Sequence, residues 1–380
     1  MRAFVFTDRA LERHAGRFVW LSIDAEKKQN AGFLEKHPIL GFPTFLVIDA
    51  EKEEAVFRWL GGASASQLEV LLDDAERALH PAGSGPDAAL AEADRLLGTG
   101  SGAEAARLYR DTLASAPLAW PSRDRTVESL LSVLGTTGGR EECVALARGS
   151  LSGDRNAHFA FVAAAGLDCA LGLEGAAGTE AVAALEATAR DAVGEPRIEM
   201  PADDRSSLYS LLVTARKSAA DAEGARTVAE EWLAFLEAEA TRMTSPESRA
   251  VFDPHTLAAS IEAGAPERAI PVLERSETDF PGDYNPPARL AMALREVGRH
   301  DDALAAVDRA LGLAYGPRKL RVYSTKADIL ESKGNKATAR AVLEEALRYA
   351  EGLPKAQVSA RNLDTLRKRI EAMSESAGGA

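Results

Sequence analysis

The sequence predicts a short α/β segment followed by a long all-α array of helical repeats. Two observations carry this prediction. Apolar runs typical of β-strands occur only within the first 80 residues, and a helix-pair pattern recurs further along the chain. The stretch "HPAGSGPD" separates the two patterns, because its prolines and glycines stop a helix. The expected regions are therefore α/β residues 1–80, a linker at 81–86, helical repeats at 87–351, and a capping helix with a disordered tail at 352–380.

The order expected within the first region is α-β-α-β-β-α. The runs "FVWLSID" (18–24) and "TFLVID" (44–49) are continuously apolar, which is typical of strands inside a covered parallel sheet. "EAVFRWL" (54–60) alternates and predicts a strand with Ala55, Phe57 and Trp59 on one face. Helices are expected at 4–14, at 26–37 and from about residue 64, where leucines recur at helical spacing.

The helical region contains an internal repeat. Gly264, Gly298 and Gly334 each separate two expected helices and lie 34 and 36 residues apart. Five residues after each glycine comes a small residue, and four residues later a larger apolar one; these are Ala269, Ala303 and Ala339, then Leu273, Val307 and Leu343. Small residues let two antiparallel helices cross closely, and glycine adopts the left-handed turn between them. One hairpin cannot bury its apolar face alone, so we expect roughly seven to stack into a solenoid.

This pattern resembles the tetratricopeptide repeat (TPR). It is clearest over residues 250–351, recurs at 87–117, and is degenerate between 156 and 245. The resemblance implies an α-helical superhelix that binds protein partners. The first helices of the repeats supply the groove candidates, which are Asn285, Met292, Arg295, Arg321, Ser324 and Asp328. This set lacks the lysine, asparagine and arginine clamp with which some members hold a C-terminal carboxylate. A general protein-binding groove is expected, and a structural spacer without a groove ligand is the alternative.

The first 80 residues resemble the second half of a thioredoxin-like domain. The resemblance rests on "FVWLSID", on the loop "GFPT" before a buried strand, on the hairpin around "DAEKEEA", and on the final amphipathic helix. It implies that Pro43 is the cis-proline of that fold and that the backbone of Phe42 binds an extended peptide by strand addition. A simple turn before a strand is the alternative.

The family's Cys-x-x-Cys motif is missing from this region, as is the strand that leads into it and lies at the centre of the sheet. Each buried backbone group left unpaired costs about 1–3 kcal/mol, so the remaining strands should re-pair or be poorly ordered. One interpretation is that Met1 is an internal methionine of a longer reading frame, similar to thioredoxin-family proteins of bacterial envelopes. The other interpretation is that the domain has lost its N-terminal part and keeps only a structural role.

The resemblances therefore imply a bacterial thioredoxin-family protein with a TPR-type protein-interaction region and a part in redox homeostasis. Thiol–disulfide exchange is expected only if a Cys-x-x-Cys lies upstream of Met1, and the chain as given is expected to be redox-inactive. The alternative is a non-enzymatic TPR scaffold or adaptor whose vestigial thioredoxin-like domain serves for docking.

Composition and charge restrict the partners. The net charge of −13 argues against nucleic acid and anionic membranes, which both attract basic surfaces. No run of 18 apolar residues occurs, and the first residues lack the features of a signal peptide. A cytoplasmic protein is expected from the chain as given, and a periplasmic or secreted one if the true start lies upstream. The sequence leaves the oligomeric state and the partner's identity open.

The remaining motifs favour structural roles. The two cysteines, Cys143 and Cys169, are expected to be separate small apolar residues in helix interfaces, with a redox pair as the alternative. The six histidines show no metal-ligand spacing, so neither a metal nor a cofactor is expected. "GTGSGAEAAR" (98–107) superficially resembles a phosphate loop, but no strand precedes it, and it is expected to be a hairpin turn.

Overall fold

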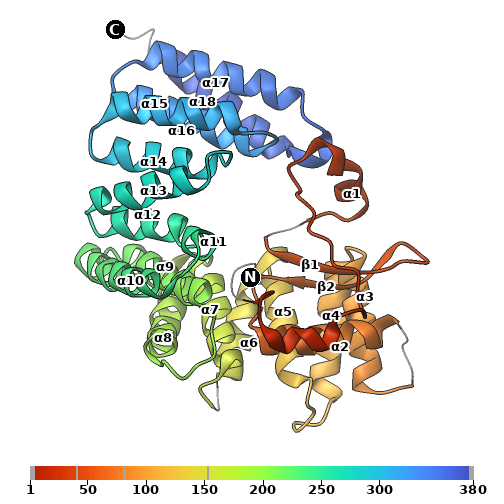
Figure 1. Cartoon of the computed structure of the whole chain (residues 1–380). Coiled ribbons are helices and arrows are strands. Elements are labelled where there is room, and N and C mark those ends of the chain that lie inside the picture. The colour runs from red at the N-terminus through yellow and green to blue at the C-terminus, as the bar shows by residue number, and fades with distance from the viewer. Residues whose placement is uncertain (1–4, 40–41, 80–82, 152–153, 376–380) are drawn as a thin grey trace. The chain divides into compact units, whose positions relative to one another are not determined.

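A computed structural model describes residues 5–39, 42–79, 83–151 and 154–375 of the chain (Figure 1). It is mostly helical, with one two-stranded sheet among the described residues. The chain divides into two compact units. Unit 1 comprises residues 1–19 and 39–232, and unit 2 comprises residues 20–38 and 233–380. The region boundaries expected from the sequence stay a prediction, and residues 80–82 and 376–380 of the expected linker and tail lie outside the described residues.

The sheet of unit 1 joins β1 (Thr44–Asp49) and β2 (Glu54–Leu60) in antiparallel order, with an irregularity between Val47 and Ile48. Both strands have the bounds that the sequence predicts. Ala55, Phe57 and Trp59 are buried, but so are their neighbours on the other face of β2. Three helices contact this strand, namely α2 (Ala65–Leu79), α3 (Pro86–Gly98) and α5 (Arg123–Thr137), so β2 is a core strand covered on both faces.

The prediction of a strand at residues 18–24 is wrong. The described backbone has no regular structure there, and Val19 and Leu21 are 89% and 77% exposed. An apolar run becomes a strand only when another strand pairs with it, and the sheet among the described residues contains β1 and β2 alone. The flanking helices are shorter than expected. They are η1 (Arg9–His14), η2 (Lys28–Asn30) and α1 (Ala31–Lys36), and Phe4 lies outside the described residues.

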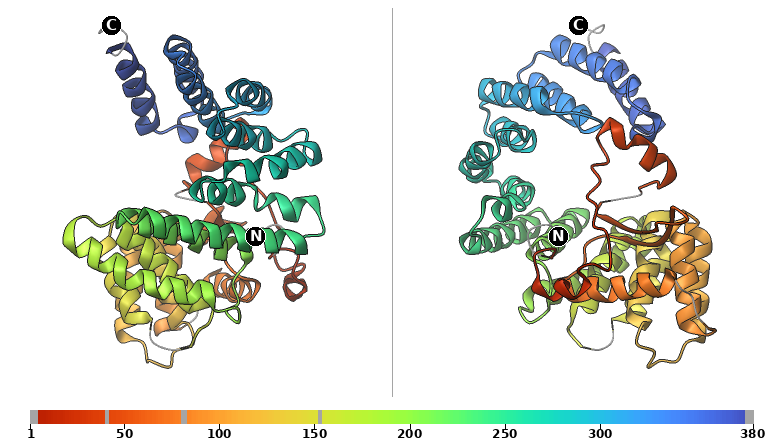
Figure 2. Two further views of the ribbon diagram at one scale, coloured as in Figure 1. Left: turned by 90° about the vertical axis from the view of Figure 1, so that its left-hand side faces the viewer. Right: turned by 45° about the vertical axis from the view of Figure 1, so that its right-hand side comes forward.

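The rest of the chain forms seven successive helix pairs among the described residues. In the first two pairs, α3 pairs with α4 (Gly102–Ser115) and α5 pairs with α6 (Arg140–Ser150). The later pairs are α7 (Ala157–Leu171) with α8 (Gly175–Gly194), α9 (Ala202–Ser218) with α10 (Ala222–Arg242), α12 (Asp253–Glu262) with α13 (Ile270–Asp279), α14 (Asn285–Glu296) with α15 (His300–Leu313), and α16 (Arg318–Ser332) with α17 (Lys336–Glu351). The short elements α11 (Pro246–Ala250), η3 (Pro266–Ala269) and η4 (Lys355–Gln357) and the final helix α18 (Ala360–Glu375) complete the chain. Figure 2 shows α12 to α17 stacked in successive layers.

The predicted repeat register is confirmed. Ala269, Ala303 and Ala339 are completely buried, as are the larger apolar residues that follow them. The three turn glycines have φ values of 73° (Gly264), 76° (Gly298) and 81° (Gly334), in the left-handed region. A side chain would be strained there, so glycine is required for these turns. The stretch 98–107 forms the turn between α3 and α4 and the start of α4, as expected.

The two cysteines form a disulfide that the sequence analysis did not predict. Cys143 of α6 and Cys169 of α7 are both buried, as expected, but their sulfurs are bonded to each other. The expectation of two separate small residues is therefore wrong. The helices cross closely enough for a bond because Gly166 of α7 lies against α6, and a Cβ at that position would stand 2.6 Å from the Cβ of Ala147.

A buried polar network ties the sheet of unit 1 to its first helix pairs. The Arg125 guanidinium of α5 donates to Asp94 Oδ1 of α3 at 2.9 Å, and its Nε lies 3.2 Å from Asp74 Oδ2 of α2. Tyr109 of α4 donates to the same Asp94 oxygen at 2.6 Å, and the guanidinium lies over the Phe57 ring of β2. Because α2, α3, α4, α5 and β2 all contribute, the α/β part and the first helix pair share one core.

Candidate protein-binding surface

The first helices α14, α16 and α18 of unit 2 carry a ladder of ion pairs. Arg295 Nη1 of α14 lies 3.4 Å from Asp328 Oδ2 of α16. Arg369 of α18 pairs with Asp328 and, at 2.6 Å, with Glu331. Opposite charges on three successive first helices thus alternate across one face. Two of the six predicted groove residues, Arg295 and Asp328, are brought together by this ladder.

The other groove candidates lie on the same helices. Arg321 and Ser324 precede Asp328 by seven and four residues, so they share its side of α16. Arg321 is exposed and makes no ion pair with the described residues, whereas Ser324 is half-buried. Met292 of α14 is half-buried and packs against the core of the repeats. The Asn285 side chain donates to Asp283 Oδ1 at 2.7 Å, which turns it back toward its own loop.

Both arginines of the ladder, Arg295 and Arg369, are paired with carboxylates. Burial alone would lower the pKa of Arg369, but its hydrogen bonds to Glu331 and Asp328 outweigh this effect and raise the pKa above its usual value. Arg295 also pairs with Glu296, with 2.5 Å between Nη2 and Oε1. Each ladder cation is therefore matched by carboxylates, whereas Arg321 makes no ion pair with the described residues. A carboxylate clamp made from several free cations is not what this face offers.

Phe42 and Pro43 lie in unit 1, immediately before β1. The Phe42–Pro43 peptide bond is cis, as the sequence analysis predicts. Pro43 accepts a hydrogen bond from the backbone of Gly61 at 2.9 Å, which ties the loop to the end of β2. Phe42 is 69% exposed. Both cysteines lie in α6 and α7 and are bonded to each other, so neither supplies a thiol beside the proline. Peptide binding at Phe42 and Pro43 stays a prediction.

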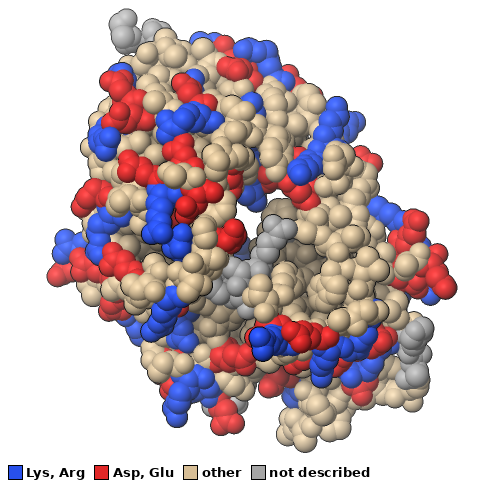
Figure 3. All heavy atoms as spheres, in the orientation of Figure 1, with Lys and Arg blue, Asp and Glu red and all other residues tan. Residues whose placement is uncertain are grey.

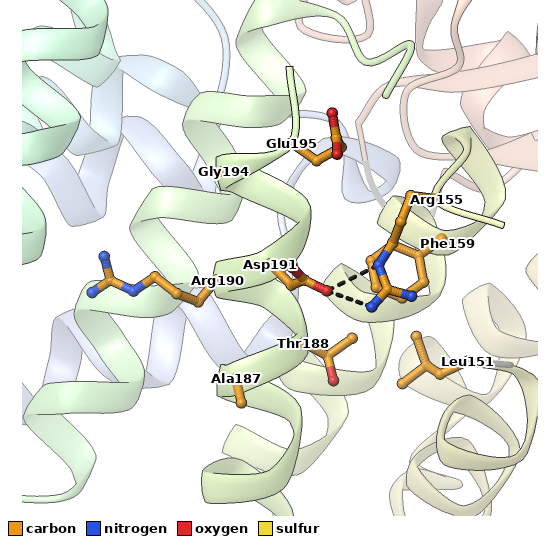
Figure 4. A pocket seen from close by; sticks show the side chains of 9 residues that line it. All are labelled: Leu151, Arg155, Phe159, Ala187, Thr188, Arg190, Asp191, Gly194 and Glu195. Atoms are coloured by element: carbon orange, nitrogen blue, oxygen red, sulfur yellow. Dashed lines mark hydrogen bonds and ion pairs between the residues drawn. The ribbon is translucent and has the colours of Figure 1, made fainter. Parts of the chain in front are cut away.

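A surface pocket of about 620 Å³ lies between α7, α8 and the end of α6 in unit 1 (Figure 4). The charged side chains that line it already have partners of opposite charge. Arg155 donates to Asp191 at 2.9 Å and stacks on Phe159, and Arg190 donates to Glu231 at 2.5 Å. Glu195 is hydrogen-bonded by Arg197, which lowers its pKa to about 2. No unpaired charge in this lining remains to select a ligand, so the pocket carries no site assignment.

Charged side chains of both signs are mixed along the described part of the chain. In Figure 3, acidic and basic side chains are interspersed over the visible face. The described residues contain no group of three or more histidines, cysteines, aspartates or glutamates placed to hold a metal ion. Within the same residues, no helix is long and apolar enough to cross a lipid bilayer.

Sequence reasoning missed the contribution of α18 to this face. The sequence predicts only a capping helix within residues 352–380, but Arg369 of α18 also extends the ladder. A signal was present, since Arg295 and Asp328 already alternate in sign on consecutive first helices. A complementary cation on the next first helix continues that alternation.

Comparison with known proteins supports the repeats. The tetratricopeptide repeat family model matches residues 284–352, which comprise α14 to α17. This part of the chain therefore consists of TPR repeats. No curated protein matches the chain in sequence.

One solved structure supports a similar fold. A tetratricopeptide repeat protein from Parabacteroides merdae covers 76% of this chain and is itself covered completely, with a TM-score of 0.50 at 11% identity. Two others match less well. The TPR protein YrrB, described as having an unusual peptide-binding site, covers 65% of this chain with 94% of its own length, at 12% identity and a TM-score of 0.27. The TPR2AB domain of yeast Sti1, solved with pHSP90, covers 75% with 98% of its length, at 14% identity and a TM-score of 0.28. The thioredoxin-like prediction for residues 1–80 gains no support from these matches.

Proposed function

We propose that this protein is a non-enzymatic scaffold or adaptor whose TPR repeats bind a protein partner. The observation that carries the proposal is the TPR match over α14 to α17 together with the face that α14 and α16 form. The ladder links these helices through ion pairs, and the same helices carry the exposed Arg321 and the half-buried Ser324 and Met292. An unpaired cation on α16 and a partly exposed apolar side chain on the neighbouring helix α14 suit an extended segment with one acidic and one apolar anchor.

Site-specific photo-crosslinking tests the groove. A crosslinking amino acid at position 321 or 324 should capture a protein partner in cells, and the same amino acid at position 275 should not. Arg275 is a matched control, because it is an exposed arginine on the second helix α13. Capture at position 275 with the same efficiency would contradict a groove on the first helices.

Affinity measurements with the identified partner then decide the role of the free cation. Arg321→Glu should weaken binding at least tenfold, which corresponds to about 1.4 kcal/mol, because it places a like charge against the partner's acidic anchor. Arg275→Glu should leave the dissociation constant unchanged. Equal binding by the wild-type protein and Arg321→Glu would remove Arg321 from the site.

A second candidate rests on the two strands and the amphipathic helix α2 that follow Pro43, whose order supports a thioredoxin-like docking module in the first 80 residues. The nucleophile of thiol–disulfide exchange is a thiolate, and both cysteines of this chain are buried in a disulfide with each other. The chain should therefore give no turnover in an insulin-reduction assay. Measurable turnover would contradict the scaffold proposal.

The same disulfide bears on the compartment. Disulfides persist where the environment is oxidising and are rare in reducing cytosol, so we favour a periplasmic or secreted location over a cytoplasmic one. Protein isolated from cells under thiol-blocking conditions should then carry no alkylated cysteine before reduction and two after it. Alkylation of both cysteines without reduction would favour the cytoplasm.

A further inference from the structure

A short acidic segment lies against the last repeats of unit 2, although it is distant in sequence. Residues 24–26 contact Tyr284, Tyr315, Arg318 and Gln357, at sequence separations of 258 residues and more. The helix α1, which follows this segment, lies beside η4. Figure 1 shows α1 next to the ends of the C-terminal helices.

Each residue of the segment has its own partner. Tyr315 donates its hydroxyl hydrogen to Asp24 Oδ2 at 2.6 Å. Gln357 Nε2 donates to the Ala25 carbonyl oxygen at 3.0 Å. The Glu26 carboxylate forms an ion pair with Arg318 and lies 3.4 Å from the Tyr284 hydroxyl. The two carboxylates and the carbonyl between them thus each form a hydrogen bond or an ion pair with a residue of the repeat region.

The repeat side of this contact is shaped for a backbone. Gly316 has a φ of 57°, and a Cβ at this position would stand 2.3 Å from the carbonyl oxygen of Glu26. Only glycine allows the segment to approach so closely. The rings of Tyr284 and Tyr315 stand edge to face beside it, with centroids 6.1 Å apart. These residues lie in the loops that lead into α14 and α16, where the helix N-termini favour negative charge.

Electrostatics show that the fit depends on charge. The hydrogen bond to Asp24 raises the pKa of Tyr315 to about 12. Burial raises the pKa of Glu26, because desolvation disfavours the charged carboxylate, and the neighbouring Arg318 offsets only part of this effect. The hydrogen bonds and the ion pair described above for residues 24–26 involve side chains and one carbonyl rather than a strand ladder. Another extended segment with two carboxylates on either side of one residue can make the same contacts and replace this one.

We propose that Tyr284, Tyr315, Gly316, Arg318 and Gln357 form a recognition site for an extended Asp-x-Glu segment of a partner protein. Asp24–Glu26 occupies the site as a built-in ligand that the partner displaces. The site lies at the N-terminal ends of α14 and α16, where Arg318 precedes Arg321 of the proposed groove by one turn. None of its five residues belongs to that groove, so variants at these residues test the proposal separately from the groove.

Binding of a labelled peptide tests the proposal. The probe is a fluorescent peptide of residues 20–30, and binding is followed by fluorescence anisotropy at low ionic strength. The full-length double variant Asp24→Asn/Glu26→Gln, in which the built-in ligand is weakened, should bind the probe at least tenfold more tightly than the wild-type chain does. A probe carrying the same two substitutions should not bind.

Receptor variants establish where the probe binds. Adding Arg318→Gln or Tyr315→Phe to the double variant should weaken binding at least tenfold, whereas Arg340→Gln, on α17 and outside the site, should not. Unchanged circular dichroism and melting of each variant show that the fold is retained. Failure of the probe to bind the double variant, or equal binding in the presence of Arg318→Gln, overturns the proposal. A wild-type dimer whose subunits exchange residues 20–38, detected by light scattering and inter-subunit crosslinking, overturns it too.

Discussion

At the scale of single residues, Arg125 stabilises unit 1 because its buried guanidinium pairs with two buried carboxylates, those of Asp74 and Asp94. Burial raises the pKa of Asp94, and the neighbouring guanidinium opposes that rise. Arg125→Met keeps the approximate volume but leaves Asp74 and Asp94 buried without this partner. We expect a loss of about 3–5 kcal/mol in the free energy of unfolding, measured by urea denaturation.

The control for this prediction is Arg107→Met on α4. Arg107 is 69% exposed and faces Asp111 at 3.6 Å, a surface pair that contributes less than about 1 kcal/mol. Equal losses for the two variants would mean that the network adds nothing beyond a surface ion pair.

Asp253 gives unit 2 a predictable pH dependence. Burial raises its pKa from 3.8 to about 6, and Arg289 at 3.9 Å is too far away to hydrogen-bond it. The folded state therefore holds a proton that the unfolded state has lost between about pH 4 and pH 6. Stability contributed by this group is present at low pH and falls as pH rises through that window.

Asp253→Asn should remove this dependence. The variant should match the wild-type chain near pH 4 and exceed it above pH 6 by up to about 3 kcal/mol, the free energy that corresponds to the pKa rise. Urea midpoints at pH 4, 5, 6 and 7 measure the difference. A constant difference across that range would show that the Asp253 carboxyl titrates normally in the folded protein.

At the scale of elements, β2 and α3 meet at Gly98. A Cβ at this position would stand 2.6 Å from the Ala55 carbonyl oxygen, which is backbone and cannot rotate away. Gly98→Ala should therefore force the helix off the strand and cost about 1–3 kcal/mol, despite the better helix propensity of alanine. Thermal melting followed by circular dichroism measures the loss.

Gly149→Ala is the matched control, since this glycine also lies in a helix and a Cβ there would meet nothing within 4 Å. It should be neutral or stabilising by up to about 1 kcal/mol. Equal effects at Gly98 and Gly149 would mean that the strand and the helix do not pack as closely as the structure shows.

The elements that were predictable from sequence are those set by local periodicity. The strands at 44–49 and 54–60 and the glycine-centred repeats each carry their own signal, so their bounds and register agree with the structure. The run at 18–24 carries the same strand signal but forms none, because strand formation depends on a partner strand that local sequence does not specify. The Cys143–Cys169 bond and the ladder through Arg369 depend on contacts between helices, which spacing within one helix does not determine.

At the scale of the whole molecule, two compact units share one chain, and each has its own buried residues. Ala303 of unit 2 is completely buried in a cluster that includes Leu273 and Val307. Ala303→Trp should overpack the crossing of α14 and α15 and cost about 1–3 kcal/mol. An unchanged melting temperature would mean that the repeat register is wrong.

Combining this substitution with Gly98→Ala tests whether the two sites contribute independently to stability. The residues around Gly98 belong to unit 1, and no residue that a Cβ there would contact appears in the cluster around Ala303. Losses at sites without shared partners add to within about 0.5 kcal/mol. The double variant should therefore lose the sum of the two single losses in urea denaturation monitored by circular dichroism. A coupling free energy above about 1 kcal/mol would show that the two sites interact energetically.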